Sequence, residues 1–225
     1  MKKDFKYYLK WFFDSFIWLG VLFFVIDIVT KNVVVQNADK IFAGGGKNGG
    51  IDIIPGFLGI NYVINNKVVF GLDIFKNDVT NRIVFIIVAL GIAIGIVIFL
   101  IKKWGKLNKF YKACLMLVIA GAIGNVVDRI FYSAEYLNYI DQSSGKYITG
   151  VVDWIDFYGI WGFNFNIADS VVVVAAIMLI IYMVVSDVIE YRKKAKATPK
   201  AKEDNEKVIS KTEQEKNEYL KSKDE

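Results

Sequence analysis

Four long apolar stretches, separated by polar segments, dominate the pattern of this chain. They run from about residue 12 to 29, 83 to 101, 113 to 127 and 167 to 185, and only the first and the fourth contain charged residues. Because about 20 helical residues cross the hydrocarbon core of a bilayer, the pattern predicts an all-α polytopic membrane protein with four transmembrane helices. No small-residue cleavage site follows the first stretch, so we expect a retained span and not a removed signal peptide.

The polar segments between the apolar stretches differ in character. Residues 51–75 are rich in β-branched and aromatic residues and are interrupted by Gly, Pro and Asn, which favours short strands joined by turns. The glycine-rich residues 44–50 lack the spacing of a phosphate-binding loop, so we interpret them as a flexible turn. Residues 192–225 alternate lysine with acids, and we expect a disordered or loosely helical tail beyond a membrane domain of residues 1–191.

The placement of lysine and arginine gives the direction of the spans. Basic residues cluster in residues 2–10, in the loop 102–112 and in residues 192–196. The positive-inside rule therefore places both termini in the cytoplasm and the loops 31–82 and 128–166 outside it, so the β-rich region is extracytoplasmic. With this orientation four carboxylates fall toward the outer side: Asp27, Asp128, Asp153 and Asp169.

Composition narrows the chemistry that these carboxylates could perform. The 225-residue chain is 55% hydrophobic and has no histidine, which excludes a Ser-His-Asp triad, a Cys-His pair and the usual zinc-binding helices. Its one cysteine, Cys114, lies in an apolar stretch, where we interpret it as a small hydrophobic residue. Gly91 and Gly95 form a small-xxx-small pair that predicts close helix packing. Carboxylates near lipid are costly and rare unless they act, so the four acids are candidates for function.

Two carboxylates can hydrolyse a peptide bond without metal, histidine or serine. An ionised carboxylate takes a proton from water while a protonated one donates to the carbonyl oxygen, and mutual repulsion separates their titrations. Asp153 precedes the fourth span and Asp169 lies one or two turns into it, and a chain reversal at residues 158–162 would bring them together. The alternatives are that Asp169 caps its helix and that Asp153 is an ordinary loop acid.

Five short motifs, in a fixed order, carry a resemblance to a known family. They are Asp27-Ile28-Val29-Thr30-Lys31, the segment that begins at Asn65, Gly124-Asn125-Val126-Val127-Asp128-Arg129, Val151-Val152-Asp153-Trp154 and Phe165-Asn166-Ile167-Ala168-Asp169. Together they resemble lipoprotein signal peptidase (signal peptidase II), a family of membrane aspartyl proteases that mature bacterial lipoproteins. The resemblance covers about residues 12–190. It departs from the family at Lys67, where glycine is usual, and this lysine either alters substrate preference or points into solvent.

The resemblance implies a mechanism, a substrate and a location. Asp153 and Asp169 would form the catalytic pair, acting without a metal or other cofactor on diacylglyceryl-modified prolipoproteins, which are cut just before the lipid-bearing cysteine. The site would face the outer side of the bacterial cytoplasmic membrane, in a monomer that contacts membrane lipid and binds no nucleic acid. Ten further residues would contact the substrate or support the pair: Asp27, Lys31, Asn65, Gly124, Asn125, Asp128, Arg129, Val152, Asn166 and Ala168.

Some roles remain open at this stage. We expect Asp128 and Arg129 to be structural, and Asn125 and Asn166 to hydrogen-bond the acid pair or the substrate backbone. Asp27 and Lys31 lie four residues apart, which predicts either an ion pair at the membrane surface or a direct substrate contact. Two functions of other classes are an ion- or proton-coupled transporter, which would usually have more helices and acids nearer the midplane, and a membrane assembly protein without enzymatic activity.

Overall fold

A computed structural model describes residues 4–46, 49–66, 77–140, 145–158 and 162–221 of the chain. The chain divides into two units, with the boundary between Met178 and Leu179. In order, the elements of the described residues are α1 (Phe5–Ser15), α2 (Ile17–Gln36), α3 (Ala38–Phe42), β1 (Ile51–Ile54), β2 (Leu58–Asn65), α4 (Asp78–Lys103), α5 (Lys109–Phe131), α6 (Ala134–Leu137), β3 (Val151–Asp156), β4 (Asn164–Phe165) and α7 (Ile167–Lys221). Lys67, the departure from the family pattern, lies outside the described residues.

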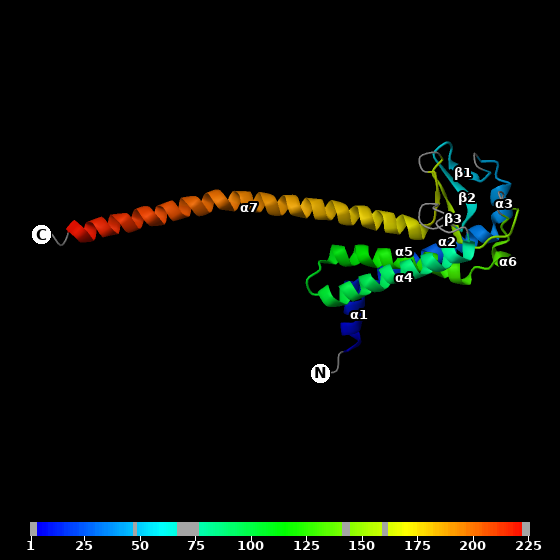
Figure 1. Ribbon diagram of the computed structural model, residues 1–225, viewed down its shortest axis with the longest axis horizontal. Helices are drawn as coiled ribbons and strands as arrows, with labels where there is room; N and C mark the ends of the chain where they lie inside the picture. Colours follow the sequence, from blue (N-terminus) through cyan, green and yellow to red (C-terminus); the bar gives the residue numbers. More distant parts are fainter. Residues whose placement is uncertain (1–3, 47–48, 67–76, 141–144, 159–161, 222–225) are drawn as a thin grey trace. The chain divides into compact units, whose positions relative to one another are not determined.

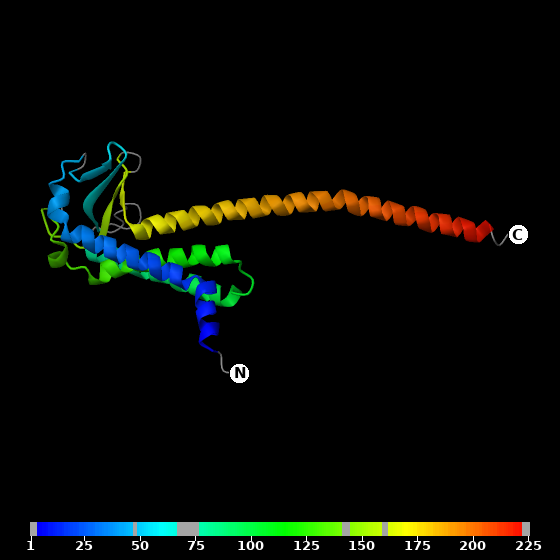
Figure 2. The ribbon, with the colours of Figure 1, turned by 180° about the vertical axis from the view of Figure 1, so that it is seen from behind.

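Four helices are long and apolar enough to cross a membrane, which confirms the predicted fold class. These candidate spans are Ile17–Gln36, Val79–Lys103, Lys109–Phe131 and Ile167–Lys194. In the first unit α5 packs against both α2 and α4, and the three helices lie side by side in both views (Figures 1 and 2). Many large apolar side chains on these helices are exposed, such as Ile87 and Ile94 on α4, which suits a surface that faces lipid.

The first span begins later than the sequence predicts. Phe16 takes a left-handed conformation with φ of 60°, and this residue separates α1 from α2. The Ser15 hydroxyl donates a hydrogen bond to the Phe12 carbonyl at 2.7 Å and accepts one from the Ile17 backbone N–H at 3.3 Å. It thus provides partners for a backbone carbonyl and a backbone N–H on either side of the break. The span then continues to Gln36, well past the predicted end at residue 29, and Asp27 and Lys31 lie within it.

A small antiparallel sheet follows the predicted β-rich region. Its strand order is β1-β2-β3-β4, and Val63 in β2 pairs with Asp153 in β3. The antiparallel pairing of β3 with β4, which aligns Ile155 with Phe165, requires the chain to reverse between them. Part of the predicted reversal, residues 159–161, lies outside the described residues. Side chains of the sheet pack with those of α2, α3 and the segment that contains α6, in a cluster formed by Val34, Ile41, Tyr62, Ile64, Tyr132, Leu137, Ile148 and Val152.

The glycines of α5 and α4 differ in their surroundings. A Cβ atom on Gly121 of α5 would lie 2.4 Å from the Ala168 carbonyl oxygen, so glycine permits α5 to approach the start of α7. Gly91 and Gly95 of α4 instead have no described atom within 4 Å of the position where a Cβ would be. The prediction of close helix packing at Gly91 and Gly95 is therefore wrong among the described residues. This part of α4 packs through Ala89 and Ala93, which are buried, and the two glycines lie on a face that no described residue covers.

The charged tail is helical in the structure. Helix α7 continues through Lys221, where the sequence pattern favours a disordered or loosely helical segment. An exposed ion pair one helical turn apart, with Lys194 Nζ 2.6 Å from Glu190 Oε1, is of the kind that supports an exposed helix. The proposed division of the chain at residue 192 stays a prediction.

Candidate active site

The two acids that the sequence singles out come from different elements of the first unit. Asp153 is the third residue of β3, and it is 2% exposed. Asp169 is the third residue of α7, in its first turn and only partly buried, so it lies nearer the helix start than the predicted one or two turns. The antiparallel return from β3 to β4 brings the chain back to the start of α7 and so toward Asp153.

Asn166, the residue before α7, contacts both acids. Its side-chain Nδ2 donates to Asp153 Oδ1 at 2.7 Å, and its backbone N–H donates to Asp169 Oδ2 at 3.3 Å. The Asp169 backbone N–H in turn donates to Asn166 Oδ1 at 2.8 Å. This exchange is a capping box, so Asp169 does cap its helix, as one alternative holds. The cap uses only one carboxylate oxygen of Asp169, and Oδ1 remains for a second contact.

Asn125 of α5 makes that second contact. Its Nδ2 donates to Asp169 Oδ1 at 2.7 Å, while its Oδ1 accepts from Asn166 Nδ2 at 3.1 Å. From β2, Asn65 Nδ2 donates to Asp153 Oδ2 at 3.0 Å. Each oxygen of the two carboxylates therefore accepts a hydrogen bond from an asparagine, and the three asparagines fix the orientation of both acids.

Burial dominates the electrostatics of Asp153. Desolvation raises the pKa of this carboxyl well above its ordinary value, and the negative charge of Asp169 raises it further. The hydrogen bonds from Asn65 and Asn166 oppose the shift but do not reverse it. The site thus combines a carboxyl that tends to keep its proton with a less buried carboxylate beside it.

A buried ion cluster, formed by Lys31, Asp27 and Asp128, lies next to the site. Lys31 Nζ lies 2.7 Å from Asp27 Oδ2 and 2.9 Å from Asp128 Oδ2, and the three side chains are at most 1% exposed. The same nitrogen donates to Asn125 Oδ1 at 3.1 Å, which joins the cluster to the asparagines. The predicted pairing of Asp27 with Lys31 is present, and the pair is buried between α2 and α5. Its predicted place at the membrane surface stays a prediction.

The two acids of this cluster hold the backbone next to Asp153 and Asp169. Asp27 Oδ1 accepts a hydrogen bond from the Ala168 N–H at 2.8 Å. This N–H group belongs to the first turn of α7, where the backbone N–H groups have no carbonyl partner within the helix. Asp128 Oδ2 accepts from the Val152 N–H at 3.3 Å. Each acid therefore fixes the residue that immediately precedes a candidate catalytic aspartate.

Small and apolar motif residues allow these contacts to form. A Cβ on Gly124 would lie 2.7 Å from Asp27 Oδ2, so only glycine leaves room for this carboxylate. Val152 is fully buried in the hydrophobic cluster that the sheet forms with α2 and α3, and Ala168 is 1% exposed. The structure thus brings together, among the described residues, the site residues that the sequence singles out on α2, β2, α5 and β3 and at the start of α7.

Arg129 of α5 is buried beside the site. Its Nη1 donates to the Asn125 carbonyl at 3.4 Å, and its guanidinium carbon lies 3.6 Å from the ring centroid of Phe85. Phe85 was not singled out by the sequence, where it is one aromatic residue in an uncharged span with no signal that distinguishes it. A cation over an aromatic face is stabilised, so Phe85 fixes Arg129, which interacts electrostatically with Asp153 and Asp169.

In the described part of the chain, no group of three or more His, Cys, Asp or Glu side chains is arranged to hold a metal ion. Asp27, Asp128 and Lys31 form an ion cluster in which the lysine occupies the place between the carboxylates. What the arrangement supplies chemically is a pair of linked carboxyl groups with different degrees of burial.

Comparisons with known proteins agree with one another. The model of the signal peptidase (SPase) II family matches residues 19–185. A lipoprotein signal peptidase of Fusobacterium nucleatum is 29% identical over 167 residues, which are 74% of this chain and 84% of that protein. One of Clostridium novyi is 30% identical over 166 residues, which are 73% of this chain and 97% of that protein. A bacterial membrane enzyme solved by the in meso method at 2.3 Å resolution is similar with a TM-score of 0.55 and 29% identity, over 76% of this chain and 87% of that one.

Proposed function

The chain belongs to the signal peptidase II family, and from this membership we propose that Asp153 and Asp169 are the catalytic pair of a membrane aspartyl endopeptidase. The protein is a multi-pass bacterial membrane protease that removes signal peptides from prolipoproteins. An ion-coupled transporter and a membrane assembly protein, the two alternatives from the sequence, are not favoured by this membership.

The observation that carries the proposal is the contact of one residue, Asn166, with both carboxyl groups. Asn166 Nδ2 lies 2.7 Å from Asp153 Oδ1, and the backbone nitrogen of the same residue lies 3.3 Å from Asp169 Oδ2. The contact with Asp169 is the capping box of α7, and the additional hydrogen bond from the same asparagine to Asp153 is what an ordinary cap and an ordinary loop acid would not need. A pair of aspartates that share a water and a substrate carbonyl does need a fixed mutual orientation.

The different surroundings of the two acids support different starting roles. Asp169 is less buried than Asp153, so we assign it as the ionised base that takes a proton from the attacking water. Asp153 has a raised pKa, and we assign it as the acid that donates its proton to the oxygen of the scissile carbonyl. When the tetrahedral intermediate collapses, Asp169 gives its proton to the leaving nitrogen and Asp153 recovers one from the hydroxyl that becomes the carbonyl.

The buried cluster has a positioning role in this proposal. Asp128 and Asp27 hold the N–H groups of Val152 and Ala168, so they set the backbone from which the two catalytic side chains project. Lys31 pairs with both carboxylates, so its single positive charge offsets part of the negative charge that lies near the catalytic pair. Catalytic efficiency is sensitive to displacements of about 1 Å, so this support matters even without contact with substrate.

The substrate class and the orientation complete the proposal. The protein cleaves diacylglyceryl-modified prolipoproteins just before the lipidated cysteine, and it acts as a monomer with both termini in the cytoplasm. This arrangement places the catalytic pair toward the outer face, where a substrate can keep its signal helix and lipid chains in the membrane. Lysine clusters at both termini and in the loop 102–112 support the orientation.

A peptide pair tests the proposed substrate class. The purified protein in lipid vesicles is incubated with a lipobox peptide whose cysteine carries a diacylglyceryl group, and with the same peptide whose cysteine is unmodified. We expect cleavage before the cysteine of the lipidated peptide alone. Equal cleavage of both peptides would refute the dependence on lipid, and cleavage of neither by folded protein would refute the peptidase function.

A further inference from the structure

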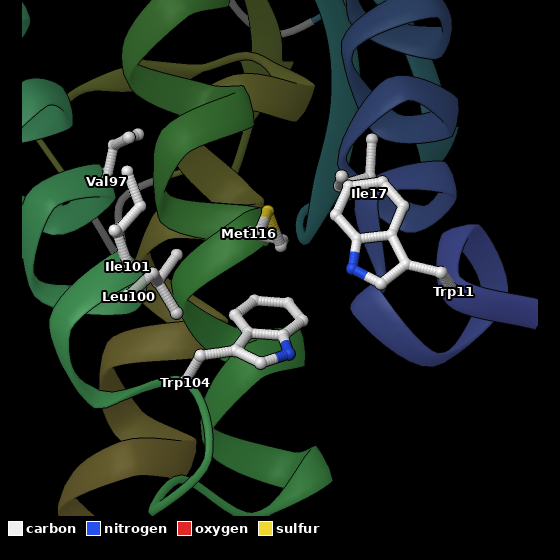
Figure 3. A pocket seen from close by; sticks show the side chains of 7 residues that line it. All are labelled: Trp11, Ile17, Val97, Leu100, Ile101, Trp104 and Met116. Carbon is white, nitrogen blue, oxygen red and sulfur yellow. The ribbon is translucent and has the colours of Figure 1, made fainter. Parts of the chain in front are cut away.

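An apolar pocket lies in the first unit, where α4 ends and α5 begins, away from the candidate active site. It has a volume of about 310 Å³. Figure 3 shows side chains from α1, α2, α4 and α5 and the indole of Trp104, which follows α4, around it; Trp11 lies on the side away from Val97, Leu100 and Ile101. The lining consists of Trp11, Ile17, Val97, Leu100, Ile101, Trp104 and Met116. Nothing in the proposed peptidase function uses this pocket.

The break at Phe16 places α1 beside the pocket. Because Phe16 is left-handed, α1 does not continue the axis of α2, and its residue Trp11 reaches the pocket lining. Helix α1 contacts α5 but leaves most of its large apolar side chains exposed, including Phe5 at 77% and Phe13 at 53%. A short helix with exposed aromatic residues and lysines next to a span is typical of a segment that lies at the membrane interface.

The rim of the pocket carries positive charge. Lys112 Nζ lies 4.2 Å from the ring centroid of Trp104, so one ammonium group is held directly at the lining. The segments that carry the lining residues, 10–17 and 97–116, contain one acid, Asp14, whose Oδ1 lies 3.2 Å from Lys109 Nζ. The lysines of these segments are Lys10, Lys102, Lys103, Lys106, Lys109 and Lys112.

We propose that this pocket binds one phospholipid with an anionic headgroup. Its acyl chain fills the apolar space, which is continuous with the exposed apolar face of α4, and its phosphate lies at Lys112 beside the two indoles. Tryptophan combines an apolar ring with a polar N–H and favours this level of a bilayer. With the orientation proposed above, the lipid belongs to the cytoplasmic leaflet, where anionic headgroups attract basic residues.

The charge makes the proposal specific. Any acyl chain fits an apolar pocket at a lipid-facing surface, so occupancy by lipid alone would not distinguish a site from bulk bilayer. Each basic residue near an anionic membrane surface strengthens attraction by a factor of roughly five. We therefore expect phosphatidylglycerol to be preferred over phosphatidylcholine, and this preference to depend on Lys112.

Quenching by brominated lipids measures the preference at the pocket. The reporter protein keeps Trp104 and has phenylalanine at the other tryptophans, and its circular dichroism spectrum must match that of the unmodified protein as proof of folding. Bilayers contain either phosphatidylglycerol or phosphatidylcholine with brominated acyl chains. Lys112→Gln tests the rim, Val97→Phe fills the pocket without a change in charge, and Lys40→Gln removes one exposed lysine of α3, outside the pocket, as the matched control.

We expect phosphatidylglycerol to quench Trp104 several-fold more effectively than phosphatidylcholine. Lys112→Gln should reduce this preference about fivefold, Val97→Phe should reduce quenching by both lipids, and Lys40→Gln should change neither. Lipid retained by the unmodified full-length protein after detergent extraction from mixed bilayers, measured by mass spectrometry, should show the same preference. Equal quenching by the two lipids, or a Lys112→Gln protein identical to the Lys40→Gln protein, would overturn the proposal, whatever the peptidase activity.

Discussion

Lys31 lies between two buried carboxylates, and its replacement measures how much this cluster stabilises the fold. Lys31→Met keeps most of the apolar stem but removes the cation that lies 2.7 Å from Asp27 Oδ2 and 2.9 Å from Asp128 Oδ2. Both carboxylates are at most 1% exposed, so water cannot replace the lost charge. Removing one partner of a buried ion pair costs about 3–5 kcal/mol, and we expect the free energy of unfolding to fall by that amount.

A second lysine–aspartate pair serves as the matched control. Lys109 Nζ lies 3.2 Å from Asp14 Oδ1, but these side chains are 74% and 47% exposed. Exposed pairs contribute at most about 1 kcal/mol, because water and salt screen them. Lys109→Met should therefore change the free energy of unfolding by less than about 1 kcal/mol, although the same substitution is made.

The assay is chemical unfolding of the purified variants in detergent micelles, followed by tryptophan fluorescence. A third variant, with Lys31→Met, Asp27→Asn and Asp128→Asn together, removes all three charges and keeps an oxygen that can accept from the Ala168 and Val152 N–H groups. We expect it to recover most of the stability lost in Lys31→Met. Equal losses in Lys31→Met and Lys109→Met, or no recovery in the triple variant, would refute the reasoning.

Three further predictions concern the site and the tail. Activity should be lost as pH rises through the raised pKa of Asp153, because the acid then loses its proton; Asn65→Ala, which removes a hydrogen bond that lowers this pKa, should move the alkaline limb of the pH–activity profile to higher pH. Gly124→Ala should reduce turnover at least tenfold, since its Cβ would lie 2.7 Å from Asp27 Oδ2, whereas Gly91→Ala, with open space around it, should not. Deleting residues 197–225 should leave turnover within a few-fold, and complete loss in a stably inserted protein would contradict the separation of tail and peptidase.

The sequence predicted those helices and strands for which a local pattern of residues favours a single type of secondary structure. Four apolar stretches predicted four spans because a helix of about 20 apolar residues satisfies its own backbone groups and is long enough to cross the bilayer core. The β-branched and aromatic residues of 51–75 predicted strands, and β1 and β2 lie in the described part of that segment, while residues 67–75 lie outside the described residues. The ordered motifs also indicated which side chains would meet, although their catalytic role stays a prediction.

Long-range packing accounts for what the sequence did not predict. The i, i+4 spacing of Asp27 and Lys31 indicates an ion pair. The local sequence does not indicate that Asp128, from another helix, contacts the same lysine or that the three side chains are buried. The break at Phe16 was missed because phenylalanine is not a residue that favours the left-handed conformation. The pattern at Gly91 and Gly95 predicted a neighbour, and none of the described residues is one, since a small-residue face permits close packing without requiring it.

The central claim is that Asp153 and Asp169 act as one acid–base pair, and their replacement by asparagine tests it most directly. Asparagine keeps the shape of aspartate but cannot exchange a proton at the pH of the assay. The measurement is turnover of a diacylglyceryl lipobox peptide by purified Asp153→Asn, Asp169→Asn and double-variant proteins of equal fold, with the exposed Asp14→Asn as control.

We expect each single substitution to lower turnover by roughly 10²–10⁴-fold or more, the double substitution to be little worse, and Asp14→Asn to keep normal turnover. Substantial turnover by folded Asp153→Asn or Asp169→Asn protein, or losses that multiply in the double variant, would contradict the account.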